Sequence, residues 1–336
     1  MQTILITGGA GFIGSNFIPY FLSKNKNVRI VNLDALTYAG DLNNLSELEN
    51  TENYIFEKGN ICDRKLIESL FTTYNFTDVI HFAAESHVDN SIKNPDAFVQ
   101  TNVFGTFNLL DVAKNFWMNS PNQYKSEFKN SRFHHISTDE VYGSLGENGL
   151  FTEETAYAPN SPYSASKAAS DFLVRSYFHT YGFNAVTTNC SNNYGPKQHD
   201  EKLIPTIIRK AIKGENIPIY GDGKNVRDWL FVADHCSGIE LAFRNGKAGE
   251  TYNIGGNNER NNLFIANKIC EILDEKVPKS VSYKTQISFV KDRAGHDFRY
   301  AIDASKIEKE LGWKADENFE TGIKKTVNWY LTKYKN

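Results

Sequence analysis

The sequence predicts an α/β protein built on a doubly wound parallel sheet, and three observations support this fold class. A short β-prone run at residues 3–7 is followed by a glycine-rich turn at residues 8–14, a helical stretch and a second β-prone run at residues 28–34. Residues 78–84 form an apolar run typical of a strand buried on both faces of a parallel sheet. Strand-like and helical segments alternate until about residue 190, which is the pattern of successive βαβ units.

The composition indicates a soluble globular protein with one large core or two lobes. The chain has 336 residues, of which 40% are hydrophobic and 23% are charged. Its net charge of -3 provides no broad basic field, so we expect no nucleic-acid partner. The uncharged residues 3–23 are interrupted by four glycines, and no basic segment precedes them. We therefore expect no signal peptide and no membrane helix.

The cysteines indicate a reducing compartment. They lie far apart in the sequence, at Cys62, Cys190, Cys236 and Cys270. This spacing suits neither a metal site nor a disulfide framework. We therefore expect a cytoplasmic protein without a bound metal.

The first βαβ unit is arranged like a dinucleotide site. Gly8, Gly11 and Gly14 let the backbone turn tightly and approach a pyrophosphate, whose charge suits the amino terminus of the following helix. Asp34 ends the second strand twenty residues after Gly14, where a carboxylate can bind a ribose hydroxyl. Because Asp34 would repel a 2′-phosphate, the pattern favours NAD over NADP. The alternative is a glycine turn with a purely structural role.

A candidate reacting centre follows in two short segments. A β-prone run precedes residues 137–140, which places them at the carboxyl end of a strand, where open α/β sheets bind ligands. Tyr163 and Lys167 lie four residues apart on a helix that is capped by Asn160 or Ser161 and ends before Gly182, so they share one face. A phenol that takes a proton near neutral pH needs a lowered pKa, and a neighbouring ammonium lowers it. Taken alone, the pair is also consistent with a Tyr and a Lys that lie on the protein surface at this spacing by chance.

Together with the glycine signature and residues 137–140, the Tyr163 and Lys167 pair resembles the extended short-chain dehydrogenase/reductase family. This resemblance implies a Rossmann-type doubly wound sheet with a second, smaller interleaved α/β substrate domain, and NAD as cofactor. It also implies that Tyr163 is the acid and base, that Lys167 holds the nicotinamide ribose and lowers the Tyr163 pKa, and that Thr138 hydrogen-bonds the reacting oxygen.

Within this family, residues 137–143 are most similar to the dTDP-glucose 4,6-dehydratase branch. Residues 36–40, 84–89, 201–205 and 292–297 support the same resemblance. Sugar epimerases of the same fold lack the Asp139-Glu140 pair. Loss of water needs an acid for the departing hydroxyl and a base for a carbon-bound proton, and these carboxylates stand in that place. The resemblance implies that Tyr163 removes the 4-hydroxyl proton as hydride leaves C4, that Glu140 removes the C5 proton, and that Asp139 protonates the C6 hydroxyl.

The resemblance also implies three sets of site residues and no metal. The catalytic set is Thr138, Asp139, Glu140, Tyr163 and Lys167. The cofactor set is Gly8, Gly11, Phe12, Ile13, Gly14, Asp34, Ala35, Leu36, Thr37, Asn60, Ile61, Phe82, Ala83, Ala84, Glu85, Ser86, Thr101, Tyr163, Lys167 and Asn193. The substrate set is Ser86, Thr138, Asn192, Lys202, Leu203, Pro218, Ile219, Tyr220, Arg227, Asn262, Asp292, Arg293, Ala294, Gly295 and His296.

The chain departs from the family pattern at a few positions. Asn60 stands where Asp is usual and either accepts from the adenine amino group or only turns the chain. Ala294 stands where Pro is usual, and residues 197–200 replace a more aromatic run. Arg227 and Arg293 suit a diphosphate by charge and fork geometry, although each alone is also consistent with a structural or solvated arginine.

Two lobes and a homodimer are expected. The NAD-binding domain is predicted at residues 1–190 plus 226–258, and the sugar-nucleotide domain at residues 191–225 plus 259–336. Residues 226–232 and 251–254 look like strands that return to the first domain. In the family, helices corresponding to residues 98–117 and to the helix after Ser161 commonly pair between subunits. Burial of the first helix within the subunit is the alternative.

The residues leave three other functions open. Thymidine, uridine and cytidine sugars share the diphosphate and the chemistry, so a dehydratase acting on UDP-glucose or CDP-glucose is the first alternative. A sugar-nucleotide epimerase or decarboxylase is the second, and the Asp139-Glu140 pair argues against the epimerase. A non-catalytic NAD-sensing protein is the third, and the intact Thr138, Tyr163 and Lys167 argue against it.

Overall fold

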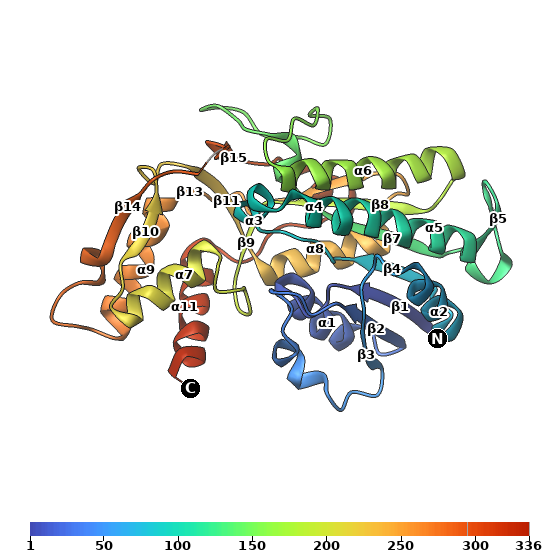
Figure 1. The fold of residues 1–336 in the computed structure, drawn as a ribbon, viewed down its shortest axis with the longest axis horizontal. Coiled ribbons are helices and arrows are strands. Elements are labelled where there is room, and N and C mark those ends of the chain that lie inside the picture. The colour runs from blue at the N-terminus through green and yellow to red at the C-terminus, as the bar shows by residue number, and fades with distance from the viewer. Residues whose placement is uncertain (294, 336) are drawn as a thin grey trace.

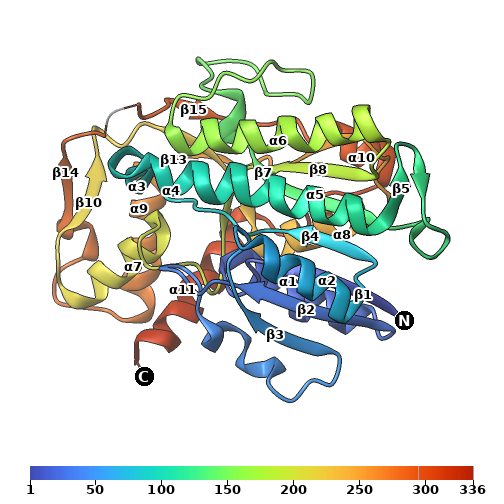
Figure 2. The same ribbon diagram turned by 45° about the vertical axis from the view of Figure 1, so that its right-hand side comes forward.

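The computed structural model describes residues 1–293 and 295–335, and within this part of the chain a seven-stranded parallel sheet forms the centre. This central sheet confirms the predicted Rossmann-type fold (Figures 1 and 2). The predicted substrate residue Ala294 lies outside the described residues. In spatial order the strands are β3 (Tyr54–Lys58), β2 (Val28–Asp34), β1 (Gln2–Thr7), β4 (Asp78–His81), β7 (Arg132–Thr138), β8 (Ala185–Cys190) and β12 (Thr251–Ile254).

Helices cover both faces of the central sheet. One face packs against α1 (Phe12–Lys24) and α8 (Val232–Asn245), and the other against α2 (Arg64–Tyr74), α5 (Thr106–Trp117) and α6 (Pro162–Tyr181). Successive side chains of a strand point to opposite faces, so Ile4 and Ile6 join the first core while Leu5 joins the second. Burial on both faces explains why the centre of β1, residues 4–6, is a continuous apolar run.

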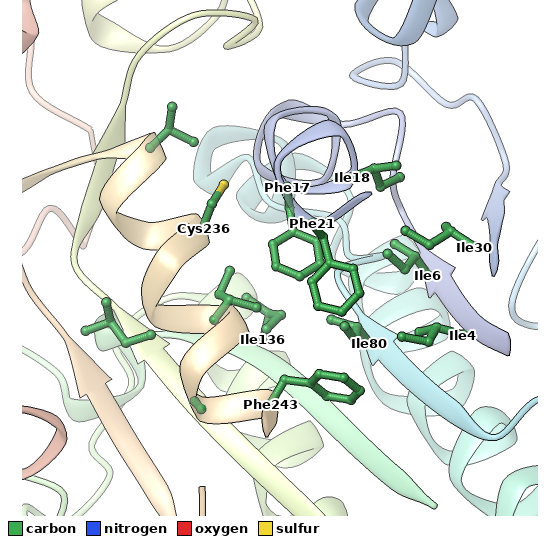
Figure 3. Packing of buried hydrophobic residues seen from close by; sticks show 14 of the residues in the cluster. Ile4, Ile6, Phe17, Ile18, Phe21, Ile30, Ile80, Ile136, Cys236 and Phe243 are labelled. Atoms are coloured by element: carbon green, nitrogen blue, oxygen red, sulfur yellow. The ribbon is translucent and has the colours of Figure 1, made fainter. Parts of the chain in front are cut away.

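The core beneath α1 illustrates this packing (Figure 3). Phe17 and Phe21 lie with their ring centroids 5.2 Å apart and are completely buried. Figure 3 shows the two rings above Ile80 of β4 and Phe243 of α8, and Phe21 contacts Phe243 edge to face. This packing fixes the start of α1 against the carboxyl end of β1, where the glycine-rich turn lies.

A second core lies beside the first, at the left of Figure 1. It contains α7 (Leu203–Lys213), α9 (Asn262–Lys276) and α11 (Phe319–Lys335), with β10 (Ile217–Tyr220) paired to β14 (Ile287–Val290). Among the described residues, β11 (Val226–Phe231) joins β13 (Glu259–Asn261), β15 (Arg299–Tyr300) and β9 (Asn192–Tyr194) in a four-stranded sheet.

Residues 226–232 and 251–254 are predicted to return to the first domain as strands, and they take different places: β12 joins the central sheet, whereas β11 joins the four-stranded sheet. The reason is visible along β11, because Trp229 and Phe231 pack against Tyr194 in the second core while Leu230 faces the first. The strand therefore lies between the two cores. The exact domain boundaries stay a prediction.

The remaining elements connect these layers. They are α3 (Val88–Lys93), α4 (Pro95–Phe98), a π-helix η2 (Val99–Gly105), β5 (Met118–Ser120), β6 (Gln123–Tyr124), α10 (Ser305–Leu311) and the 3-10 helices η1 (Leu42–Leu48), η3 (Ser126–Phe128), η4 (Asp139–Tyr142) and η5 (Tyr283–Gln286). In the described part of the chain, every helix is too short or too polar to span a bilayer.

Candidate active site

A cavity of about 310 Å³ lies along the carboxyl ends of the central strands. It is lined by Gly8 after β1, Asp34 at the end of β2, Phe82 after β4, Thr138 at the end of β7 and Cys190 at the end of β8. Because the carboxyl ends of parallel strands meet at one edge, residues far apart in sequence converge here. The cavity therefore joins the glycine-rich turn to the candidate reacting centre.

Many of the predicted site residues line this cavity. They are Gly8, Gly11, Phe12, Ile13, Gly14, Asp34, Ala35, Thr37, Asn60, Ile61, Phe82, Ala83, Ala84, Glu85, Ser86, Thr101, Thr138, Asp139, Glu140, Tyr163, Lys167, Asn192, Asn193 and Lys202. The predicted residues outside its lining are Leu36, Leu203, Pro218, Ile219, Tyr220, Arg227, Asn262, Asp292, Arg293, Gly295 and His296. The roles of both groups stay predictions.

Sequence reasoning missed other residues that line the cavity. They are Leu33, Ala39, Gly40, Gly59, Ile136, Cys190, Ser191, Gln198, His199 and Glu201. Ser137 also lines the cavity, and it belongs to the predicted reacting centre at residues 137–140. Cys190 and Ser191 could have been found, because they end a strand next to β7 and share its carboxyl edge. Gln198 and His199 carry no such signal, since they belong to a run without strand or helix periodicity.

The glycine-rich turn fits the diphosphate of NAD. A Cβ on Gly8, whose φ is 72°, would lie 2.6 Å from the Ala83 Cα atom, and a Cβ on Gly14 would lie 2.6 Å from the Gly9 Cα atom. Gly11 is the N-cap of α1 and supplies no side-chain hydrogen bond to its first N–H groups. These groups and the positive end of the helix dipole therefore lie at the cavity wall, where they suit a phosphate.

Asp34 is fixed in the cavity lining at the carboxyl end of β2. Its carboxylate accepts hydrogen bonds from the backbone N–H of Ala10 at 2.9 Å and of Leu36 at 2.8 Å. Burial raises the Asp34 pKa, and these two hydrogen bonds oppose the rise. The carboxylate keeps acceptor capacity for a ribose hydroxyl. The Oδ1 atom of Asn60 accepts from the Cys62 N–H at 2.9 Å, so Asn60 turns the chain while lining the cavity.

Tyr163 and Lys167 are positioned by the start of α6. Ser161 and Ser164 form a capping box, and Tyr163 is buried against Val88 and Phe98. Burial raises the Tyr163 pKa well above its usual value, the charge of Glu140 raises it further, and a hydrogen bond with Thr138 opposes this.

The net Tyr163 pKa is raised in the polypeptide, so the expected lowering by Lys167 stays a prediction. The Lys167 Nζ atom donates instead to the Ile136 carbonyl at 2.9 Å. Burial of the phenol is the largest cause of the raised Tyr163 pKa.

Asp139 and Glu140 differ in environment. Burial and then the charges of Glu140 and Asp228 raise the Asp139 pKa well above its usual value, while Arg227 opposes the rise. The Asp139 Oδ1 atom accepts from the Thr138 hydroxyl at 3.4 Å, and Oδ2 has no hydrogen-bond partner among the described residues. Asp139 is therefore favoured in its protonated form.

Glu140 faces positive charge. Burial raises its pKa, but Arg293, Lys202 and Arg227 oppose the rise. The neighbouring carboxyls are thus pushed toward different protonation states, an arrangement that separates an acid from a base.

The predicted phosphate-binding arginines are held at the border between the two cores. The Arg227 guanidinium donates to the carbonyls of Val226 and Asp297, at 2.7 and 2.9 Å, and its Cζ atom lies 4.2 Å from the Tyr300 ring centroid. Arg293 Nη1 donates to Asp89 at 3.3 Å, and its buried Nε atom has no partner within residues 1–293 and 295–335. Over the same residues, no group of His, Cys, Asp and Glu could hold a metal ion.

The chain is similar to known proteins in sequence and in fold. Residues 5–326 match the family model described as GDP-mannose 4,6 dehydratase. A dTDP-glucose 4,6-dehydratase from Xanthomonas campestris pv. campestris (strain B100) is 56% identical over 334 residues, which cover 99% of this chain and 94% of that relative.

Two solved structures share the fold over the whole chain. A dTDP-glucose 4,6-dehydratase from Bacillus anthracis str. Ames in complex with NAD has a TM-score of 0.88 and 44% identity, and the match covers 100% of this chain and 98% of that one. A dTDP-glucose 4,6-dehydratase from Streptomyces venezuelae with NAD and TYD bound has a TM-score of 0.90 and 40% identity, with 99% and 98% covered.

Proposed function

Because the chain belongs to the GDP-mannose 4,6-dehydratase family of short-chain dehydrogenase/reductase enzymes, we propose that it converts dTDP-glucose into dTDP-4-keto-6-deoxyglucose with bound NAD. The observation that carries this proposal is the Asp139-Glu140 pair in the same cavity as Thr138, Tyr163 and Lys167. The relative that is 56% identical and the two solved structures are enzymes of this name, which confirms the resemblance seen in the sequence.

The oxidation step uses Tyr163, Thr138 and Lys167. NAD, when bound, would supply the hydride chemistry at C4 and C6 of the sugar. Tyr163 removes the proton of the 4-hydroxyl, and the Thr138 hydroxyl, which lines the same cavity, orients the reacting oxygen. Lys167 lies four residues along the same helix, where its ammonium holds the cofactor ribose.

The elimination step uses the two carboxyls. Glu140, surrounded by Arg293, Lys202 and Arg227, acts as the base that removes the C5 proton. Asp139, kept protonated by burial, gives its proton to the departing C6 hydroxyl. Water leaves, and the sugar nucleotide undergoes no net oxidation.

Incubation with a panel of sugar nucleotides tests the proposed substrate. We expect dTDP-glucose to give the highest kcat/KM among dTDP-glucose, UDP-glucose, CDP-glucose and GDP-mannose, with a product lighter by one water in mass spectrometry. A product of unchanged mass would indicate an epimerase. Binding of NAD without turnover of any of the four would indicate a non-catalytic protein.

We also propose that the protein is a cytoplasmic homodimer. The exposed fractions of Val99, Phe104, Phe107 and Phe172 are 52%, 45%, 37% and 57%. They lie on η2, α5 and α6, and the latter two run side by side in Figures 1 and 2. Exposed apolar side chains gathered on neighbouring helices are typical of an interface. All four cysteines are free, which supports a reducing compartment.

The dimer surface predicts the effect of one substitution. Phe172→Glu is expected to convert the dimer to a monomer, because a carboxylate would be buried without a partner at the contact. Light scattering after size-exclusion chromatography measures the mass. Phe289→Glu is the matched control, since Phe289 on β14 is 59% exposed and far from α6 in sequence and in Figure 1. A Phe172→Glu protein with the mass of the native dimer would show that this surface is not the interface.

A further inference from the structure

The ammonium of Lys167 lies in an environment that disfavours its charge. Lys167 is 4% exposed, and burial lowers its pKa. Its observed hydrogen bond, to the Ile136 carbonyl, is to an uncharged group. A lysine that must stay cationic beside a cofactor ribose therefore needs a counter-charge nearby.

Asp171 provides that counter-charge from the same helix. It lies four residues after Lys167, so both side chains emerge from one face of α6, and it is 5% exposed. Burial lowers the Lys167 pKa, and the charge of Asp171 opposes this fall. Burial raises the Asp171 pKa to about 6, and the charge of Lys167 opposes this rise. At neutral pH most of the Asp171 carboxyl is therefore ionised.

The Asp171 carboxylate is locked in place by donors from outside its helix. Its Oδ1 atom accepts from His135 Nε2 at 3.1 Å, and its Oδ2 atom accepts from the Ser137 hydroxyl at 2.9 Å and the Tyr157 hydroxyl at 3.0 Å. His135 and Ser137 belong to β7, and Tyr157 lies on the segment before α6. Because Ser137 precedes Thr138, this carboxylate ties α6 to the catalytic end of β7.

The histidine, cysteine and tyrosine side chains around Lys167 are neutral. His81 of β4 and His135 of β7 have pKa values lowered well below the usual value by burial, and the positive charge of Lys167 lowers them further. Burial raises the pKa values of Cys190 on β8 and of Tyr163 on α6, which keeps the thiol and the phenol protonated. Among these groups, Asp171 supplies the negative charge.

We propose that Asp171 is a positioning residue whose locked carboxylate keeps Lys167 cationic and aligned beside Tyr163 and the cofactor ribose. Asp171 does not line the cavity and acts through Lys167. The inference rests on the proposed function for the task of Lys167, but it also makes a claim about NAD binding that does not depend on the sugar.

The test compares Asp171→Asn with Tyr157→Phe, which removes one hydrogen bond but keeps the carboxylate. Lys167 acts as a cation, so its contribution to the rate of cofactor reduction is lost as pH rises through the Lys167 pKa. Without the opposite charge this pKa falls, and the alkaline limb of cofactor reduction is expected to move down by about 1–3 pH units in Asp171→Asn. The same limb is expected to stay in place in Tyr157→Phe and in the charge-preserving Asp171→Glu.

NAD affinity, measured by calorimetry across the same pH range, provides the second readout. We expect the affinity of Asp171→Asn to fall with rising pH at the lowered Lys167 pKa, whatever sugar the enzyme uses. A loss of affinity and rate that is equal at every pH would overturn the proposal and leave Asp171 a structural role. Asp171→Ser, neutral and smaller, provides the same comparison if Asp171→Asn does not fold. If no sugar nucleotide were turned over but the NAD affinity of Asp171→Asn still showed this pH dependence, the proposed function would be contradicted and the role of Asp171 would stand.

Discussion

Tyr163→Phe is expected to abolish reduction of the cofactor by the sugar. The substitution removes the phenol that takes the 4-hydroxyl proton, and acid–base groups of this kind contribute on the order of 10²–10⁴-fold to a rate. The ring packing against Val88 and Phe98 is retained, so the fold and the binding of NAD are expected to persist. Single-turnover absorbance of the reduced cofactor measures the step directly.

Tyr157→Phe provides the control for Tyr163→Phe. Tyr157 is also a tyrosine close to α6, but it does not line the cavity. We expect Tyr157→Phe to keep a cofactor-reduction rate within about tenfold of the native rate, or about 1.4 kcal/mol. Equal losses in the two variants would remove the special role of Tyr163.

Glu140→Gln and Asp139→Asn are expected to slow dehydration by about 10²–10⁴-fold while hydride abstraction from C4 stays detectable. Glu140 acts ionised, so dehydration falls as pH drops through its raised pKa. Asp139 acts protonated, so dehydration falls as pH rises through its raised pKa. Glu140→Gln should therefore remove the acid limb of the pH–rate profile, and Asp139→Asn the alkaline limb.

These limbs belong to the dehydration step, whereas the Lys167 limb belongs to cofactor reduction, so the two steps are measured separately. Product mass reports dehydration, and absorbance reports reduction. If Glu140→Gln lost cofactor reduction as completely as Tyr163→Phe, with folding and substrate binding intact, the division between oxidation and elimination would be wrong.

Local sequence patterns predicted the parts of the site that depend on neighbours in the chain. The glycines before α1, Asp34 at the end of β2 and the helix start at Ser161 follow from backbone sterics, strand ends and capping. Once these strands are parallel, their carboxyl ends converge without further information. The candidate cofactor and catalytic residues therefore meet in one cavity, apart from Leu36.

Long-range contacts decided what the sequence could not predict. The placement of β11 depends on whether Trp229 faces the first or the second core, which periodicity alone does not determine. The raised Tyr163 pKa comes from burial by Val88 and Phe98, which are distant in sequence. Tyr220 and Arg293, which lie outside the cavity lining, both donate to Asp89, at 3.2 and 3.3 Å, a residue more than 100 positions away in the sequence.

The most direct test follows the hydrogen of C4 through one turnover. Substrate deuterated at C4 and converted in ordinary water is expected to give a product lighter by one water, with the deuterium in the new C6 methyl group. This result requires that the hydride is removed and returned on one bound cofactor, as the single cavity joining Tyr163 to the glycine-rich turn allows. Deuterium retained at C4 in a product of unchanged mass would contradict the account.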